Sequence, residues 1–219
     1  SFKRVTDKNS PHFGKIIVDG DGLPIGDSEI KKVGDQQASA LAGVTNSLAF
    51  KGFSFSFLID SRIGGDIFSA TNHTLQASGA SDVTAPGGLR ETFVVDGVVD
   101  DGKGNYTVND KAVTPQNYWG RVTGTTGNLG ISEANIYDAT NIRLRNIQLN
   151  YDFAKSMLKN MPFQKVRLGV SVNNVWMIMS HLNGIDPESV FATSTNAVGF
   201  EGYAPPTSRS YLFNVTFGF

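Results

Sequence analysis

TSRSYLFNVTFGF, residues 207–219, carries apolar side chains at every second position, namely Tyr211, Phe213, Val215, Phe217 and Phe219. This two-residue period predicts a β-strand with one strongly apolar face. A soluble domain seldom ends on such a strand, because terminal residues fray and an apolar edge promotes aggregation. A barrel in lipid turns the apolar face toward hydrocarbon and the polar face toward a wet lumen. The stretch therefore favours a transmembrane β-strand over a core strand of a β-sandwich.

The composition excludes several other classes of protein. The mean hydropathy of −0.15 excludes a helical membrane protein, because a spanning helix needs about 20 consecutive apolar residues. The chain has no cysteine, so it holds neither a disulfide nor a thiolate metal site. The net charge of −1, without a basic stripe, argues against a nucleic-acid-binding protein.

Earlier stretches show the same alternation as residues 207–219. In the clearest, Phe53, Phe55, Phe57 and Ile59 follow a short Lys51-Gly52 turn, which predicts an antiparallel hairpin. The predicted strands cover 38–50, 53–62, 141–153, 165–177 and 207–219. The sequence therefore predicts an all-β fold, an antiparallel transmembrane β-barrel of which this chain supplies the C-terminal portion.

The connections between these strands alternate in length. The turn at 51–52 and the connection 154–164 are short, whereas residues 63–140 and 178–206 are long. Outer-membrane barrels have short periplasmic turns and long extracellular loops. We therefore expect the barrel strands within 38–219, both long connections outside the cell, and residues 1–37 as a further extracellular loop region.

Five strands cannot close a membrane barrel, because the smallest barrels have about eight strands. An open edge in hydrocarbon would leave backbone groups unpaired. The chain is therefore expected to be the end of a longer barrel.

Within the first long connection, we expect a small hairpin formed by Thr92–Val99 and Tyr106–Val113, and a short helix that begins in Gly64–Ser69.

Candidate chemical sites are few. Asp19, Asp21 and Asp27 resemble part of a calcium loop, although Ile30 occupies the position where a bidentate glutamate is needed. The alternative interpretation is a surface turn. Asp100 and Asp101 are adjacent and followed by glycines, which favours a turn over a catalytic pair. We expect no catalytic or cofactor-binding residues and no enzyme activity.

Several motifs in order carry a resemblance to a known family. They are FKGFS at 50–54, GGDIFS at 64–69, YDATNIRLRNI at 137–147, VSVNN at 170–174, GIDPE at 184–188 and PTSRSY at 206–211. From about residue 32 to its end, the chain resembles the C-terminal part of SusC/RagA-type TonB-dependent outer-membrane transporters. It departs from the family's pattern at Asp35-Gln36-Gln37, where an Asn-Pro-rich turn is commoner.

The resemblance implies a barrel of about 22 strands in the bacterial outer membrane. It also implies import of nutrient oligosaccharides or peptides, with a SusD-like surface lipoprotein as a lid. The plug domain and the segment that contacts TonB are expected to precede this region. The chain would then contribute barrel wall and outward loops, with the rest of the barrel and its plug, the TonB complex, lipid and the substrate as partners.

Alternation and the resemblance together assign roles to individual residues. Lipid-facing positions are predicted at Phe53, Phe55, Phe57, Ile59, Leu149, Tyr151, Phe153, Val170, Phe213, Val215 and Phe217. Lumen-facing positions are predicted at Arg143, Arg145, Asn146, Gln148, Asn150, Arg167 and Asn173. Substrate or lid contacts are predicted at Tyr118, Trp119, Phe200 and Tyr203. Phe219 is predicted to be the signal that the barrel-assembly machinery engages.

A soluble carbohydrate-binding β-sandwich is the alternative, since it also explains alternating strands, aromatic loops and high glycine content. A structural or adhesive surface protein is a third class.

Overall fold

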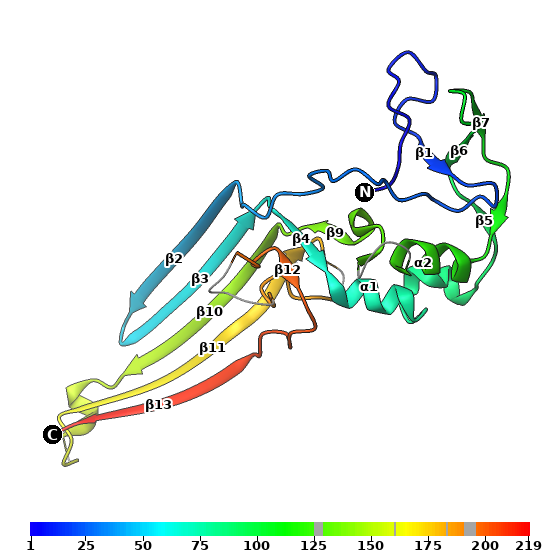
Figure 1. Ribbon diagram of the computed structural model, residues 1–219. Coiled ribbons are helices and arrows are strands. Elements are labelled where there is room, and N and C mark those ends of the chain that lie inside the picture. The colour runs from blue at the N-terminus through cyan, green and yellow to red at the C-terminus, as the bar shows by residue number, and fades with distance from the viewer. Residues whose placement is uncertain (125–128, 160, 183, 191–195) are drawn as a thin grey trace. The chain divides into compact units, whose positions relative to one another are not determined.

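A computed structural model describes residues 1–124, 129–159, 161–182, 184–190 and 196–219 of the chain (Figure 1). The chain divides into two compact units. The loop unit comprises Ser1–Asp35, Ile67–Tyr137 and Phe191–Tyr203. The sheet unit comprises Gln36–Asp66, Asp138–Val190 and Ala204–Phe219. No helix among the described residues is long and apolar enough to cross a membrane.

The sheet unit contains five strands in one antiparallel sheet of order β13-β11-β10-β3-β2. The strands are β2 (Ala40–Phe50), β3 (Phe53–Ile63), β10 (Asn141–Asp152), β11 (Lys165–Ser180) and β13 (Ser210–Gly218). A 3₁₀ turn, η5 (Lys155–Leu158), lies between β10 and β11. Each strand overlaps a range where alternation predicts one, and Figure 1 shows them side by side. Two strands end later than predicted, β3 at Ile63 and β11 at Ser180.

The turn between β2 and β3 explains their tight pairing. Lys51 and Gly52 both have positive φ, 46° and 88°. Two consecutive residues with positive φ match the twist of the flanking strands, which is why this geometry is favoured in two-residue hairpins. Phe50 then lies opposite Phe53, and the pairing continues to Ala40 opposite Ile63.

Among the strand starts, that of β13 differs most from its predicted position. Alternation predicts a strand from residue 207, whereas β13 begins at Ser210. The reason is local: the backbone N–H and the hydroxyl of Thr207 both donate to the carboxylate of Asp186, so Thr207 belongs to a loop contact.

The loop unit is built from short elements. Its sheets are β1 (Ile16–Val18) beside β6 (Gly97–Asp100) and β7 (Tyr106–Val108), and β5 (Phe93–Val94) beside β8 (Ala112–Val113). Its helical elements are α1 (Ala70–Ala77), α2 (Pro115–Gly124), η1 (Asp82–Thr84), η2 (Pro86–Gly88) and η4 (Ser132–Asn135). A further sheet has the order β12 (Phe200–Glu201), β4 (Asp66–Ser69) and β9 (Ile136–Asp138).

The hairpin predicted inside the first long connection is present as two successive ladders, β6 with β7 and β5 with β8. The predicted helix start is wrong, because Asp66–Ser69 is a strand and α1 begins at Ala70. Ser69 ends the strand and caps the helix, since its hydroxyl accepts a hydrogen bond from the Asn72 N–H at 3.1 Å.

The two units bury apolar side chains differently. In the loop unit, Val5, Ile17 and Val98 form one buried cluster, and β1 reaches it by pairing in parallel with β6. Residues 1–35 therefore pack with the long connection in one unit. In the sheet unit, every residue of β2 is exposed, and most of β13 is exposed as well.

Candidate functional site

One face of the five-stranded sheet is apolar across its whole width. Leu48 lies opposite Phe55, Phe55 opposite Leu149, Leu149 opposite Val170, and Val170 opposite Phe213. These side chains stay outside any core, with Phe213 79% and Leu48 61% exposed. A contiguous apolar face of this kind on a protein surface marks a membrane or protein contact.

The residues predicted to face lipid follow this register. Tyr151 pairs with Phe53, and their rings lie 4.5 Å apart. Phe217 lies opposite Val166, on the same face. Phe153 comes one residue after β10, and its ring packs edge-on against Tyr151 at 4.9 Å. The structure thus gathers the predicted apolar set on one face, and its contact with lipid remains a prediction.

The opposite face of the sheet is polar. Asn150 lies between Ser54 and Gly169, and Gly169 lies opposite Asn214. Gly169 matters here, because a Cβ at this position would meet the side-chain oxygens of both Asn150 and Asn214.

Hydrogen bonds link further polar residues across neighbouring strands. Asn146 donates to Asn173 at 2.7 Å, and Arg167 donates two hydrogen bonds to Asp152 at 2.7 and 2.6 Å. Gln148 lies opposite Ser56 and Ser171. The predicted lumen-facing residues of the ladder therefore share one face.

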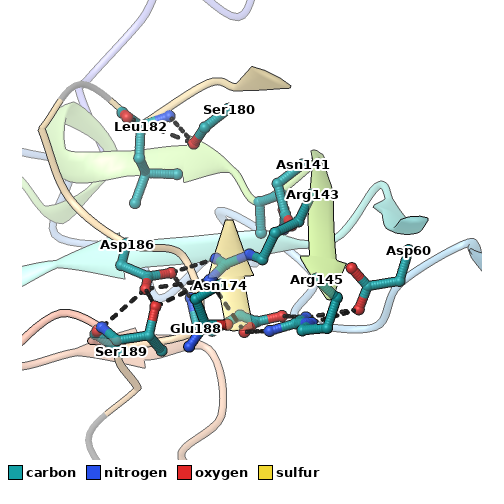
Figure 2. Close-up of polar contacts among 12 residues, drawn as sticks. Asp60, Asn141, Arg143, Arg145, Asn174, Ser180, Leu182, Asp186, Glu188 and Ser189 are labelled. Carbon is teal, nitrogen blue, oxygen red and sulfur yellow. Dashed lines mark hydrogen bonds and ion pairs between the residues drawn. The ribbon is translucent and has the colours of Figure 1, made fainter. Parts of the chain in front are cut away.

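Two arginines of β10 hold a loop against this polar face. We call Arg143, Arg145, Asp60, Asp186 and Glu188 the arginine clamp (Figure 2). Arg143 donates to Asp186 at 2.5 Å. Arg145 donates to both carboxylate oxygens of Glu188 at 2.6 and 2.8 Å, and also to Asp60 at 2.6 Å. The clamp joins β10 to β3 and to the segment after β11.

Local irregularities in the strands position the clamp. The register of β10 shifts between Leu144 and Asn146 against both of its neighbours. A bulge of this kind re-aims side chains, and here Arg145, at the shift, reaches Asp60 on β3. Arg143 lies opposite Asp60 in the ladder, which places it on the polar face as well.

The clamp is strongly desolvated at one end. The side chains of Arg143 and Asp186 are 3% and 8% exposed. Burial by itself would raise the pKa of the Asp186 carboxyl, but hydrogen bonds from Arg143 and Thr207 hold that pKa well below its usual range. The charged form of Asp186 is therefore the one that the fold stabilises.

A cavity of about 400 Å³ adjoins the clamp. Its wall includes Arg143, Asp186, Asn174, Trp176 and Arg209. Asn174 has a φ of 50° and donates to the Ser208 carbonyl, while Arg209 donates to the Asn174 carbonyl. Trp176 is 59% exposed and pairs with Leu144, which places it on the apolar face at one end of the sheet.

The four aromatic residues predicted to contact substrate or lid have different surroundings. Tyr118 is half-buried against Phe93, with ring centroids 5.2 Å apart, and burial raises its pKa. Phe200 stacks on Phe68 at 5.2 Å. Trp119 lines a polar cavity, and Tyr203 is 65% exposed with its hydroxyl 2.6 Å from that of Thr74. Tyr118 and Phe200 thus contribute to packing, whereas Trp119 and Tyr203 remain accessible.

Phe219, the predicted assembly signal, follows β13 and is 82% exposed. Its ring lies 5.3 Å from Phe163, which also packs against Phe217 at 4.8 Å.

The predicted convergence of Asp19, Asp21 and Asp27 is not found. Within the described residues no group of three or more His, Cys, Asp or Glu side chains could hold a metal ion. Asp19 instead accepts from the backbone N–H groups of Asp21 and Leu23 and from Arg121. Asp27 pairs with Lys31. The Asp-Gly sequence here forms a surface turn, because its carboxylates bond to the nearby backbone.

Sequence reasoning missed the acidic half of the clamp. Asp60 reads as a polar residue at a strand end, and Asp186 and Glu188 read only as part of a motif. The available signal was the pair of arginines at 143 and 145, which need carboxylate partners if either is buried. The spacing of more than 40 residues between Arg143 and Asp186 hid the pairing.

Comparisons with known proteins agree with this geometry. No family model matches the chain. It is 24% identical over 212 residues to TonB-dependent receptor P3 of Formosa agariphila, covering 94% of this chain and 19% of the relative. It is 30% identical over 158 residues to TonB-dependent receptor P39 of the same organism, covering 71% of this chain and 14% of the relative. The chain thus spans less than a fifth of either curated relative's length.

Solved structures support the fold. The RagAB peptide importer in its open-open state superposes with a TM-score of 0.58 at 12% identity, covering all of this chain and 22% of that chain. The closed-closed state gives a TM-score of 0.53 at 16% identity, covering 91% of this chain and 20% of that chain. The chain therefore matches a part of the TonB-dependent receptors, and the SusC/RagA-type resemblance indicated by its sequence is confirmed.

Proposed function

We propose that this chain forms part of the barrel wall and the outward loops of a TonB-dependent transporter in the bacterial outer membrane. The observation that carries the proposal is the sheet whose five strands are apolar and exposed on one face and polar on the other. Lipid and a wet lumen are the two surroundings that satisfy both faces at once.

The edges of the sheet support closure with further strands. In the described part of the chain, β2 and β13 each have a hydrogen-bonded neighbour on one side only. An unpaired strand edge in hydrocarbon costs several kcal/mol per backbone group. The missing neighbours are then strands of a larger barrel, of about 22 strands as in the plugged outer-membrane transporters.

The proposed cargo is a nutrient oligosaccharide or peptide, with a SusD-like lipoprotein as the lid and TonB supplying energy through the remainder of the protein. The polar face would line the lumen and contact the plug. The solved structures that this chain resembles are those of a peptide transporter and a peptide importer, which supports the peptide half of this proposal.

Epitope insertion in the full-length protein tests the orientation. A tag inserted after Gly102, in the turn between β6 and β7, should be detected by antibody on intact cells if this connection faces outward as proposed. A tag inserted at Lys51-Gly52 should be detected only after the cells are permeabilised. Equal detection of both tags on intact cells would contradict the proposed topology.

The soluble β-sandwich remains the alternative candidate. A sandwich needs a second large sheet to cover the apolar face, and the other sheets of the described residues have two or three strands. The chain expressed alone should therefore aggregate in detergent-free buffer. A soluble, monodisperse monomer would favour the sandwich and contradict the membrane proposal.

A further inference from the structure

A second cavity, of about 220 Å³, lies within the loop unit. Its wall comes from the end of α1, the segment after it, and the first turns of α2. The residues with hydrogen-bonding or aromatic side chains are Gln76, Ser78, Thr84, Arg90, Gln116 and Trp119. The two helices pack against each other, so the cavity rests on ordered elements.

Trp119 supplies a fixed aromatic surface. Its ring meets Tyr118 edge-on, with centroids 5.0 Å apart and planes at 88°. Tyr118 is in turn held edge-on by Phe93. Trp119 is half-buried, so part of its surface stays accessible. A large aromatic side chain that is already immobilised presents apolar area at little cost in conformational entropy.

Gln76 is a buried polar side chain of this wall, at 4% exposure, close to the 3% of Thr84. It hydrogen-bonds the Tyr137 hydroxyl, yet its Oε1 has no hydrogen-bond partner in the described part of the chain. A buried carbonyl oxygen without a partner is unfavourable. Because Gln76 lines the cavity, a hydroxyl group bound there is a candidate partner for this oxygen.

Arg90 and Gln116 each offer more than one hydrogen-bonding group to a ligand. Arg90 is exposed and donates one hydrogen bond to the Gly79 carbonyl at 2.9 Å. A guanidinium carries five donors in a planar fork. Gln116 is exposed on α2 and offers both a donor and an acceptor. Such side chains match neighbouring hydroxyl groups, each of which donates and accepts.

The volume of the cavity and the charge of its wall limit which ligands it can bind. The cavity is smaller than the ~300 Å³ at which pockets for drug-sized ligands begin, so it suits one ring and not an extended chain. Arg90 is the one charged residue among the described residues that line it. A cationic ligand would meet no carboxylate among these described residues.

We propose that this cavity, walled by Trp119, Gln76, Arg90 and Gln116, binds one pyranose ring of a glycan at the outward side of the transporter. The ring's apolar face lies on Trp119, and its hydroxyl groups bond to the amides and the guanidinium. The proposal rests on the proposed transport function and names a contact point for its oligosaccharide cargo.

The test uses the full-length protein in detergent. It is screened against an array of immobilised neutral and acidic hexose oligosaccharides and against short peptides, and the affinity for the best-retained glycan is then titrated. Gln116→Ala and Arg90→Gln should each weaken glycan binding about five- to tenfold, as expected for a lost hydrogen bond. Trp119→Ala should weaken it at least tenfold.

Asn117→Ala is the matched control, because Asn117 neighbours Gln116 on α2 and does not line the cavity. It should bind as the unchanged protein does. Gln116→Ala and Arg90→Gln alter exposed side chains and should leave the fold intact. They therefore test the proposal even if Trp119→Ala fails to fold.

Two results would overturn the proposal: retention of peptides and no glycan, or glycan binding that Gln116→Ala and Arg90→Gln leave unchanged. Import and surface tagging in the same cells separate this failure from failure of the transport function. A protein that reaches the outer membrane and imports glycan without using the cavity contradicts this inference alone.

Discussion

At the scale of single residues, Arg143 shows how the sheet holds its loop. A buried arginine is costly unless carboxylates compensate it. Arg143 is 3% exposed and has Asp186 at 2.5 Å and Glu188 at 3.5 Å. The segment that contains both acids is therefore bound to β10 by charge and by hydrogen bonds, in addition to the bonds from Thr207.

Asp186→Asn tests this binding. The substitution keeps the size of the side chain and removes its charge, which leaves Glu188, at 3.5 Å, as the carboxylate that pairs with the buried Arg143. Loss of one partner of a buried ion pair costs about 3–5 kcal/mol. We expect faster hydrogen exchange at residues 184–189, measured by mass spectrometry on the full-length protein.

The matched control is Asp101→Asn, since Asp101 bonds to Asn105 and to the nearby backbone of an exposed turn. Unchanged exchange at 184–189 in Asp186→Asn would show that the ion pair does not hold the segment.

Acid should release the same segment. The pKa of Asp186 is lowered from its ordinary value of 3.8. A group with a lowered pKa in the folded state contributes stability that is complete above its unfolded value and is lost as pH falls below it. Pepsin should therefore spare residues 184–189 at about pH 4 and cleave them more readily toward about pH 2.

Asp186→Asn should be cleaved there at both pH values, because the neutral amide cannot form the ion pair with Arg143 at either pH. Equal resistance of the unchanged protein across the range would count against Asp186 as the controlling group.

At the scale of elements, alternation and pairing place opposite chemistry on the two faces of each strand. Phe213 and Asn214 are neighbours in β13, yet Phe213 continues the row of Val170, while Asn214 continues the row of Gly169. A slip of one residue would exchange these faces. The Lys51-Gly52 turn fixes the register for β2 and β3.

Phe213→Lys and Asn214→Lys compare the two faces of one strand. A lysine on the lipid face near the bilayer midplane costs about 2–4 kcal/mol. We expect Phe213→Lys to lower the yield of folded barrel, measured as the fraction that shifts on gel electrophoresis after heating. Asn214→Lys should leave that fraction nearly unchanged. A larger loss from Asn214→Lys would reverse the assignment of the faces.

At the scale of the whole molecule, the two units fold by different means. The loop unit has buried apolar clusters, such as Val18 with Val95 and Val113. The sheet unit exposes its apolar face and is linked by backbone pairing and by the arginine clamp. The first unit suits water, and the second suits a bilayer, as proposed above.

Deletion of Phe219 tests how the whole barrel assembles. If the aromatic end is the signal for the assembly machinery, the full-length protein without Phe219 should accumulate outside the outer-membrane fraction. Phe163→Ala is the control, because it removes the ring contact of Phe219 and keeps the aromatic end. Undiminished assembly of the deletion variant, measured by membrane fractionation, would contradict this role.

Much of the sheet was predictable because alternation is a local property. A period of two residues, the glycine turn after Phe50 and the spacing of apolar stretches locate the strands without knowledge of the fold. The motifs from 50 to 211 likewise indicate the family, since each is legible in the chain.

Contacts between distant segments required the tertiary structure. The sequence gives no sign that β1 pairs with β6, about 80 residues later, or that the loops fold into a unit of their own. The same holds for Asp186 with Arg143, for Gln76 with Tyr137, and for Asp19 with Arg121.

The physical reason is the distance along the chain over which each interaction acts. Periodicity and turn chemistry act between neighbours, so the chain alone established its strands, their two faces and its relatives. Burial, ion pairing and cavities depend on which distant residues meet, so the arginine clamp and the cavity at Trp119 appeared only once the fold was known.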